Sequence, residues 1–158
     1  MGLFLSTHVN KVDRKGRVSV PATFRAALTN QSFNGIIAFP SPSPKYAALD
    51  GYGIDRIEEI VARIDDLPMF SEERENFETM LADSHQLPFD TEGRIILPAE
   101  LVEHAGITDS VSFVGLGRNF QMWAPAAYAA HKAAVRERTQ RQGIPLSLGA
   151  AERRRERE

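Results

Sequence analysis

The sequence contains no cysteine, so disulfide bonds, thiolate metal ligands and cysteine nucleophiles are all excluded. It also lacks any apolar run close to the ~18 residues that a membrane-spanning helix requires. The first residues, "MGLFLSTHVNK", have neither the basic start nor the long apolar stretch that are typical of a signal peptide. We therefore expect a cytoplasmic protein with no membrane partner.

A large net charge is missing too, because 19 basic and 21 acidic residues nearly cancel to −2. The charges are nevertheless segregated: residues 1–49 hold six basic residues against one acid, whereas residues 50–83 hold three against eleven. A length of 158 residues with 42% hydrophobic content is ordinary for one soluble globular domain. A basic front segment in an acidic protein indicates a local anionic partner.

Two stretches of the sequence repeat each other at an offset of 77, "VDRKGRVSVP" at 12–21 and "FDTEGRIILP" at 89–98. Half of the ten positions from 13 to 22 are identical in the second copy, far more than chance provides. The identical residues are Asp13 and Asp90, Gly16 and Gly93, Arg17 and Arg94, Pro21 and Pro98, and Ala22 and Ala99. This pattern predicts an internal duplication that forms two equivalent structural units.

Each copy predicts the order strand, strand, helix, strand, strand. A glycine turn separates the first two strands, and a proline, Pro21 or Pro98, is expected in the first turn of the helix. The expected elements are strands 7–12, 18–20, 35–39 and 45–50 with helix 22–28, and strands 85–89, 95–97, 110–117 and 120–124 with helix 99–105, which Gly106 ends. Interior strands of three residues give no independent stability, so we expect the two units to pack together around a pseudo-twofold axis.

The remaining segments predict helices. Isoleucines from Ile54 to Ile64 recur at helical spacing, Ser71 begins a second helix as its N-cap, and Pro125 opens a third helix that runs to about Gln142. The expected organisation is a first half at 5–53, a helical linker at 54–83, a second half at 84–127, a C-terminal helix at 128–142 and a disordered tail at 143–158.

The candidate site is the pair of Asp-x-x-x-Arg turns. In one interpretation each Asp–Arg pair only braces a tight turn. In the other, Asp13 and Asp90 orient the guanidinium groups of Arg17 and Arg94 toward phosphate or a guanine edge. The first copy adds Lys11, Arg14, Lys15 and Arg25 around Arg17, whereas the second places Glu92 beside Arg94. We therefore expect the first turn to dominate any binding of anions.

Catalytic and metal chemistry are not indicated. Neither His8 nor its repeat-related His85 has a carboxylate or a second histidine at ligand spacing, so we expect no metal and no cofactor. The sequence has no Ser/His/Asp order and no nucleophile elbow. An enzyme that used the turns on a phosphorylated substrate would need a nucleophile or a metal that the sequence does not offer, so we expect a protein that is not an enzyme.

At "DRKGRVSVPATFR" and "DTEGRIILPAELVEHAGI" the sequence resembles the bacterial MraZ family of transcriptional regulators. "THVNKVDRKGR" and "FVGLGRNFQMW" extend the resemblance, which covers about residues 2–130. It implies an α+β fold, the duplicated swapped-hairpin β-barrel of AbrB-like proteins, with two pseudo-symmetric halves in one chain and added helices.

The resemblance also implies a function. MraZ-like proteins bind double-stranded DNA at short direct repeats upstream of their own operon, in the division and cell-wall gene cluster, as ring-shaped homo-oligomers in the cytoplasm and nucleoid. The expected DNA-binding residues are Lys11, Arg14, Lys15, Arg17, Arg25 and Arg94, and the expected orienting residues are Asp13, Gly16, Asp90 and Gly93. The acidic linker at 50–83 leaves an alternative open, an AbrB-like module of the antitoxin type that binds another protein.

Overall fold

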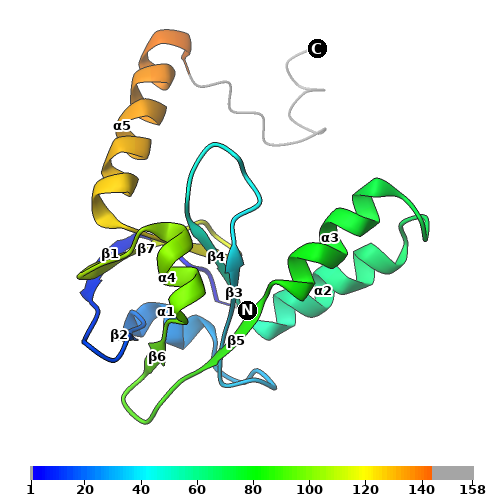
Figure 1. The fold of residues 1–158 in the computed structure, drawn as a ribbon, viewed down its shortest axis with the longest axis horizontal. Helices are drawn as coiled ribbons and strands as arrows, with labels where there is room; N and C mark the ends of the chain where they lie inside the picture. The colour runs from blue at the N-terminus through cyan, green and yellow to red at the C-terminus, as the bar shows by residue number, and fades with distance from the viewer. Residues whose placement is uncertain (1, 144–158) are drawn as a thin grey trace, which may run out of the picture. The chain divides into compact units, whose positions relative to one another are not determined.

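The computed structural model describes residues 2–143, which form eight strands and five helices (Figure 1). In chain order these are β1 (Thr7–Lys11), β2 (Arg17–Ser19), α1 (Ala22–Ala27), β3 (Gly35–Pro40), β4 (Leu49–Tyr52), α2 (Ile54–Asp65), α3 (Glu72–Ala82), β5 (His85–Pro88), β6 (Arg94–Ile96), α4 (Ala99–Ala105), β7 (Ser110–Gly115), β8 (Phe120–Trp123) and α5 (Pro125–Gln142). All strand pairs are antiparallel, and the predicted α+β class is confirmed.

The strands form a six-stranded sheet in the order β1-β7-β8-β4-β3-β5 and a separate two-stranded ribbon of β2 and β6. The first strand of each sequence copy pairs with the other copy, because β1 lies beside β7 and β5 lies beside β3. The second strands, β2 and β6, pair with each other. Each copy therefore depends on the other for the partners of its first two strands.

The register of these pairs is unchanged when the two copies are exchanged. Val18 lies opposite Ile95, its own counterpart at the offset of 77. Asp50 lies opposite Gln121, and each is the second residue of its four-residue strand. The backbone bonds Val20 N–Gly93 O (3.1 Å) and Leu97 N–Gly16 O (2.9 Å) also exchange with each other. The strand pairing thus has the pattern of a twofold axis.

One hydrophobic core receives side chains from both copies. The Phe24 ring of α1 lies 5.2 Å from Phe120 and 6.2 Å from Phe113, and the Phe4 ring lies 5.3 Å from Phe24. Val18 and Ile95 project into the same core from the ribbon. Because large aromatic side chains dominate the energetics of a core, burial of Phe24 fixes α1 against the sheet.

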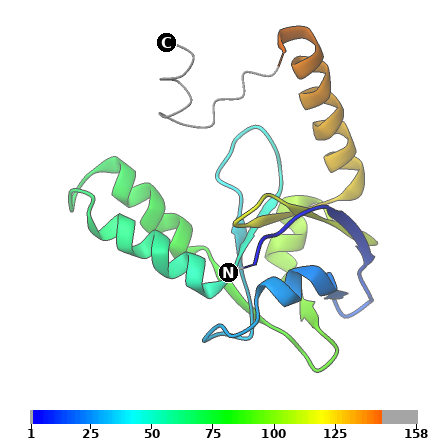
Figure 2. The same ribbon diagram turned by 180° about the vertical axis from the view of Figure 1, so that it is seen from behind.

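Helices α2 and α3 lie side by side in both views of the structure (Figures 1 and 2). Their inner residues, including Ile57 and Met80, pack on Ile37 and Phe39 of β3. The predicted N-cap is confirmed, since the Ser71 hydroxyl accepts a hydrogen bond from the backbone N–H of Arg74 at 3.2 Å. The connection between the helices exposes two adjacent apolar side chains, Met69 at 68% and Phe70 at 96%.

Three sequence predictions meet different outcomes. The strand predicted at 45–50 is wrong in its bounds: β4 begins at Leu49, which lies opposite Pro40 of β3 and Met122 of β8, so pairing with these strands sets its start. Pro21 and Pro98 lie immediately before their helices with extended backbone, rather than in the first turn. The predicted C-cap is confirmed, with Gly106 at φ 63°.

The third predicted helix is confirmed as α5, which starts at Pro125. Residues up to Tyr128 belong to one compact unit, and the rest of α5 belongs to a second unit. Within residues 2–143 no helix is both long and apolar enough to cross a membrane. The tail expected at 143–158 lies outside the described residues, apart from Gly143.

A buried polar chain lies where β4 meets β8. The Gln121 Nε2 donates to Asp50 Oδ1 at 2.9 Å, and Trp123 Nε1 donates to Gln121 Oε1 at 3.0 Å. Burial raises the pKa of Asp50, and the hydrogen bond from Gln121 offsets part of that rise. The folded protein therefore holds the proton of Asp50 more tightly than the unfolded chain does.

We predict that Asp50→Asn stabilises the protein at neutral pH, because asparagine keeps the acceptor for Gln121 without a buried charge. The folded pKa of Asp50 is raised, so the wild type loses stability as pH rises through the window above the unfolded value of 3.8. At pH 7 the melting temperature of the variant should exceed that of the wild type, by about 2–4 °C for each kcal/mol gained in the free energy of unfolding. The difference should shrink toward pH 4.

The control is Asp109→Asn, at an exposed position, which should leave the melting temperature unchanged both at pH 7 and toward pH 4. A gain for Asp50→Asn of equal size at both pH values would contradict the assignment, because an effect of packing alone does not follow the titration.

Candidate functional site

The first Asp-x-x-x-Arg motif forms a tight turn, called here the first turn (residues 13–17). The backbone N–H of Asp13 donates to Arg17 O at 2.9 Å, and the N–H of Gly16 donates to Asp13 O at 3.0 Å. Gly16 has φ 81°, a left-handed conformation that side-chain-bearing residues rarely adopt. The glycine in the motif is therefore required by the backbone of the turn.

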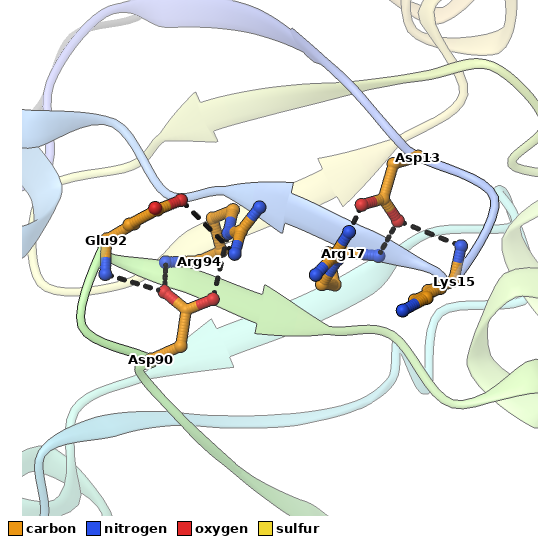
Figure 3. Close-up of polar contacts among 6 residues, drawn as sticks. All are labelled: Asp13, Lys15, Arg17, Asp90, Glu92 and Arg94. Carbon is orange, nitrogen blue, oxygen red and sulfur yellow. Dashed lines mark hydrogen bonds and ion pairs between the residues drawn. The ribbon is translucent and has the colours of Figure 1, made fainter.

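The carboxylate of Asp13 holds the turn and the guanidinium together (Figure 3). Its Oδ1 accepts from the backbone N–H of Lys15 and of Arg17, both at 2.9 Å, and its Oδ2 accepts from Arg17 Nε at 2.5 Å. The backbone N–H of Arg17 does most to hold the pKa of Asp13 below its ordinary value; burial opposes this, and the Arg17 side-chain bond adds to it. The Asp13 carboxylate therefore stays ionised at neutral pH.

The second turn (residues 90–94) repeats this geometry. Asp90 Oδ1 accepts from the backbone N–H of Glu92 and of Arg94 at 2.9 Å, and Oδ2 accepts from Arg94 Nε at 2.8 Å. Gly93 has φ 76°. One contact differs: Glu92 Oε2 lies 3.2 Å from Arg94 Nη2, so a second carboxylate draws on this guanidinium (Figure 3).

The ribbon of β2 and β6 displays both arginines on one face. Val18 and Ile95 are buried beneath it, at 1% and 0% exposure. Because side chains alternate along a strand, Arg17, Ser19, Arg94 and Ile96 all project from the opposite face. Arg17 lies opposite Ile96, and Arg94 lies opposite Ser19, so the two guanidinium groups stand at opposite ends of this solvent face (Figure 3).

The other predicted basic residues separate into two groups. Arg14 and Lys15 are exposed in the first turn, and Lys11 is exposed at the end of β1, two residues before the turn. Arg25 is different, because a Cβ added to Gly93 would lie 2.6 Å from Arg25 Nη1. Arg25 therefore lies against the second turn, and the expectation that it surrounds Arg17 is wrong.

The antiparallel pairing explains the position of Arg25. The chain leaves β2 at Ser19, opposite Arg94, and the N–H of Val20 then bonds Gly93 O at 3.1 Å. Helix α1 thus starts at the end of the ribbon where the second turn lies. Arg25 Nε donates to Val20 O at 3.1 Å, which keeps the side chain there. Helix α1 thus supplies a cation beside the second turn.

The site offers positive charge and hydrogen-bond donors. No cluster of three or more His, Cys, Asp or Glu side chains that could hold a metal ion occurs in the described part of the chain. The terminal nitrogens of Arg17 have no protein partner within residues 2–143. Sequence reasoning overlooked Ser19 and Ile96, although alternation in "RVS" and "RII" places them beside the arginines.

We predict that Gly93→Ala destabilises the protein more than Gly106→Ala. Both glycines have positive φ, so each substitution should cost about 1–2 kcal/mol. Only Gly93→Ala also drives Arg25 away and breaks its bond to Val20, which should add about 1 kcal/mol. Nothing lies within 4 Å of a Cβ added to Gly106.

Urea unfolding of the two variants measures this difference. In an Arg25→Ala background the added loss for Gly93→Ala should disappear. If it persists there, Arg25 is not the neighbour that the substitution displaces.

Comparison with known proteins identifies relatives along most of the chain. A family model described as "MraZ protein, putative antitoxin-like" matches residues 80–142. The protein named "Transcriptional regulator MraZ" from Pelagibacter ubique is 47% identical over 137 residues, 86% of this chain and 87% of that protein. Proteins of the same name are 46% identical in Rickettsia bellii, over 87% of this chain and 91% of that protein, and 43% identical in Gluconacetobacter diazotrophicus, over 92% and 93%.

These matches confirm the resemblance drawn from the duplicated motif. They cover 86–92% of this chain rather than one short segment, and the relatives share the name of a transcriptional regulator. The chain belongs to the MraZ family of transcriptional regulators.

Proposed function

We propose that this protein regulates transcription by binding double-stranded DNA with the solvent face of the β2–β6 ribbon. The observation that carries the proposal is the presentation of Arg17 and Arg94 on that face by two equivalent aspartate contacts. The major groove of B-DNA, about 12 Å wide, admits a two-stranded β-ribbon. The ribbon here also has its inner face sealed by the core, so only the face with the arginines meets solvent.

The Asp contacts suit sequence recognition. An arginine loses side-chain entropy of about 2 kcal/mol when it is ordered, and Asp13 removes part of that loss before any ligand binds. The contact occupies Nε, so the terminal nitrogens of Arg17 remain for a guanine edge. Lys11, Arg14 and Lys15 then contact phosphates, which set the register but carry no sequence information.

We further propose the duplicated swapped-hairpin barrel as the architecture. The pairing of β1 with β7, of β5 with β3, and of β2 with β6 supports it, because exchange of the two copies leaves these pairs unchanged. The proposed halves are residues 5–53 and 84–127, with the linker at 54–83, the C-terminal helix at 128–142 and the tail at 143–158.

The proposed targets are short direct repeats upstream of the protein's own operon, bound by a ring-shaped homo-oligomer in the cytoplasm and nucleoid, without catalysis. One subunit offers few cations, so its binding alone is modest and salt-sensitive. Several linked subunits on spaced repeats gain effective concentration, often by 10²–10⁴-fold. The proposal follows the family's name and the small basic face of one chain.

We predict that Arg17→Ala weakens binding to DNA from upstream of the gene by about 5–150-fold, equivalent to 1–3 kcal/mol for a lost base contact. Arg94→Ala should weaken binding less, because Glu92 already draws on Arg94 Nη2. Arg118→Ala, an exposed arginine outside the ribbon, is the matched control and should bind like the wild type. Fluorescence anisotropy at fixed salt measures all three.

If Arg17→Ala and the wild type bind this DNA with equal affinity, Arg17 does not contact the DNA. Absence of any binding by the wild type, to this DNA or to unrelated duplex, would overturn the proposed function itself.

A second candidate is an antitoxin-like module that binds another protein. The family model's description names that class, and the exposed Met69 and Phe70 offer an apolar contact at the end of an acidic helical hairpin. A pull-down without DNA tests it. The matched control is Leu116→Ser. This function is favoured if the wild type and Leu116→Ser each retain one stoichiometric protein, whereas Phe70→Ser does not. It also requires that the wild type retards no DNA.

A further inference from the structure

We propose that a hollow beside the ribbon, between β1, the end of β2 and α1, binds a phosphodiester of the DNA duplex. The hollow has a volume of about 350 Å³, and its lining includes His8, Asn10, Ser19, Thr23 and Arg25. This inference rests on the proposed function, because Ser19 belongs to the solvent face that carries Arg17 and Arg94. It adds a backbone contact that the duplicated motif does not contain.

The chemistry of the lining suits an anion. None of the described residues that line the hollow is acidic, and Arg25 contributes a positive charge. The bond from Arg25 Nε to Val20 O fixes the side chain, while its terminal nitrogens have no protein partner within the described range. Guanidinium and hydroxyl groups are among the commonest donors to phosphate oxygens in protein–DNA complexes.

The hydroxyl groups and the amide nearby complete the donor set. Ser19 and Thr23 are both exposed at the hollow. Asn10 Nδ2 donates to Ser19 O at 2.7 Å, which fixes the amide and leaves its second N–H for a ligand or a water. A volume of about 350 Å³ leaves room for several waters around a phosphate, since one water occupies about 30 Å³ of the liquid.

The second copy shows that the fold alone does not require this lining. At the offset of 77, Leu87, Ile96, Glu100 and Val102 replace Asn10, Ser19, Thr23 and Arg25. His85, the counterpart of His8, has its Nε2 3.6 Å from Glu100 Oε2. The counterpart surface is therefore apolar and acidic, and the first copy alone has the donors for an anion.

The position of the hollow favours a phosphodiester over a free anion. Ser19 lies opposite Arg94 in the ribbon, and Arg25 lies against Gly93, so the hollow adjoins the second turn. A DNA strand at the edge of a groove filled by the ribbon reaches this place. Arg25 then neutralises a phosphate beside the guanidinium of Arg94, whose neighbour Glu92 would otherwise repel the DNA.

Thr23→Glu tests the inference, because it gives the hollow the residue that the second copy already has at Glu100. Helix α4 accepts glutamate at this place, so the substitution should leave the fold and the melting temperature unchanged. We expect affinity to fall by about tenfold, by the same factor for the upstream DNA and for a scrambled duplex, since phosphate contacts carry no sequence information. Arg25→Gln should lower the slope of log K against log salt by about 1.

Gln86→Glu is the matched control. It adds the same charge on β5, away from the hollow, and measures the general electrostatic effect on binding. The inference is overturned if Thr23→Glu weakens binding no more than this control. A second experiment titrates inorganic phosphate against chloride at constant ionic strength. If phosphate binds the wild type while Thr23→Glu binds DNA as tightly as the control variant does, the inference is also overturned.

The failures of the two proposals are distinguishable. If Arg17→Ala loses affinity and Thr23→Glu behaves like Gln86→Glu, only the phosphodiester subsite is wrong. If the wild type binds neither the upstream DNA nor the scrambled duplex, the proposed function is wrong as well.

Discussion

The pairing of β2 with β6 is the interaction on which the rest of the molecule depends. Each strand has three residues, too few to be stable without the other. Their pairing buries Val18 and Ile95 side by side at the centre of the core. Because the partners are far apart in sequence, the ribbon forms only when both copies of the motif are folded. Folding should therefore be cooperative and dominated by non-local contacts.

The same pairing sets the properties of the site. It turns the arginines away from the core, and it brings α1 to the end of the ribbon where the second turn lies. The two turns are thus alike in backbone but differ in charge. The first contains Arg14 and Lys15, whereas the second contains Glu92, which contacts Arg94, and has Arg25 beside Gly93. The two turns thus share one backbone scaffold but carry different surface residues, which explains how a duplicated motif gives two turns of unequal charge.

Much of the fold could be predicted because its signals are local. The glycines with positive φ, the Ser71 cap and the Asp–Arg spacing each depend on residues within one turn of chain. The position of Arg25 could not be read in this way, because it follows from which strand β2 pairs with. The bond between Asp50 and Gln121, 71 residues apart, and the start of β4 likewise depend on tertiary contacts.

The register that places Val18 opposite Ile95 and Asp50 opposite Gln121 has a further consequence. In a dimer of identical chains, any substitution near the twofold axis appears twice, and the two ends of the surface stay identical. Here both copies lie in one chain, so Thr23 and Glu100 could diverge independently. The two ends of the resulting surface therefore differ, so the surface has a direction. A linear ligand bound along it is held in one direction only, which a symmetric surface cannot enforce.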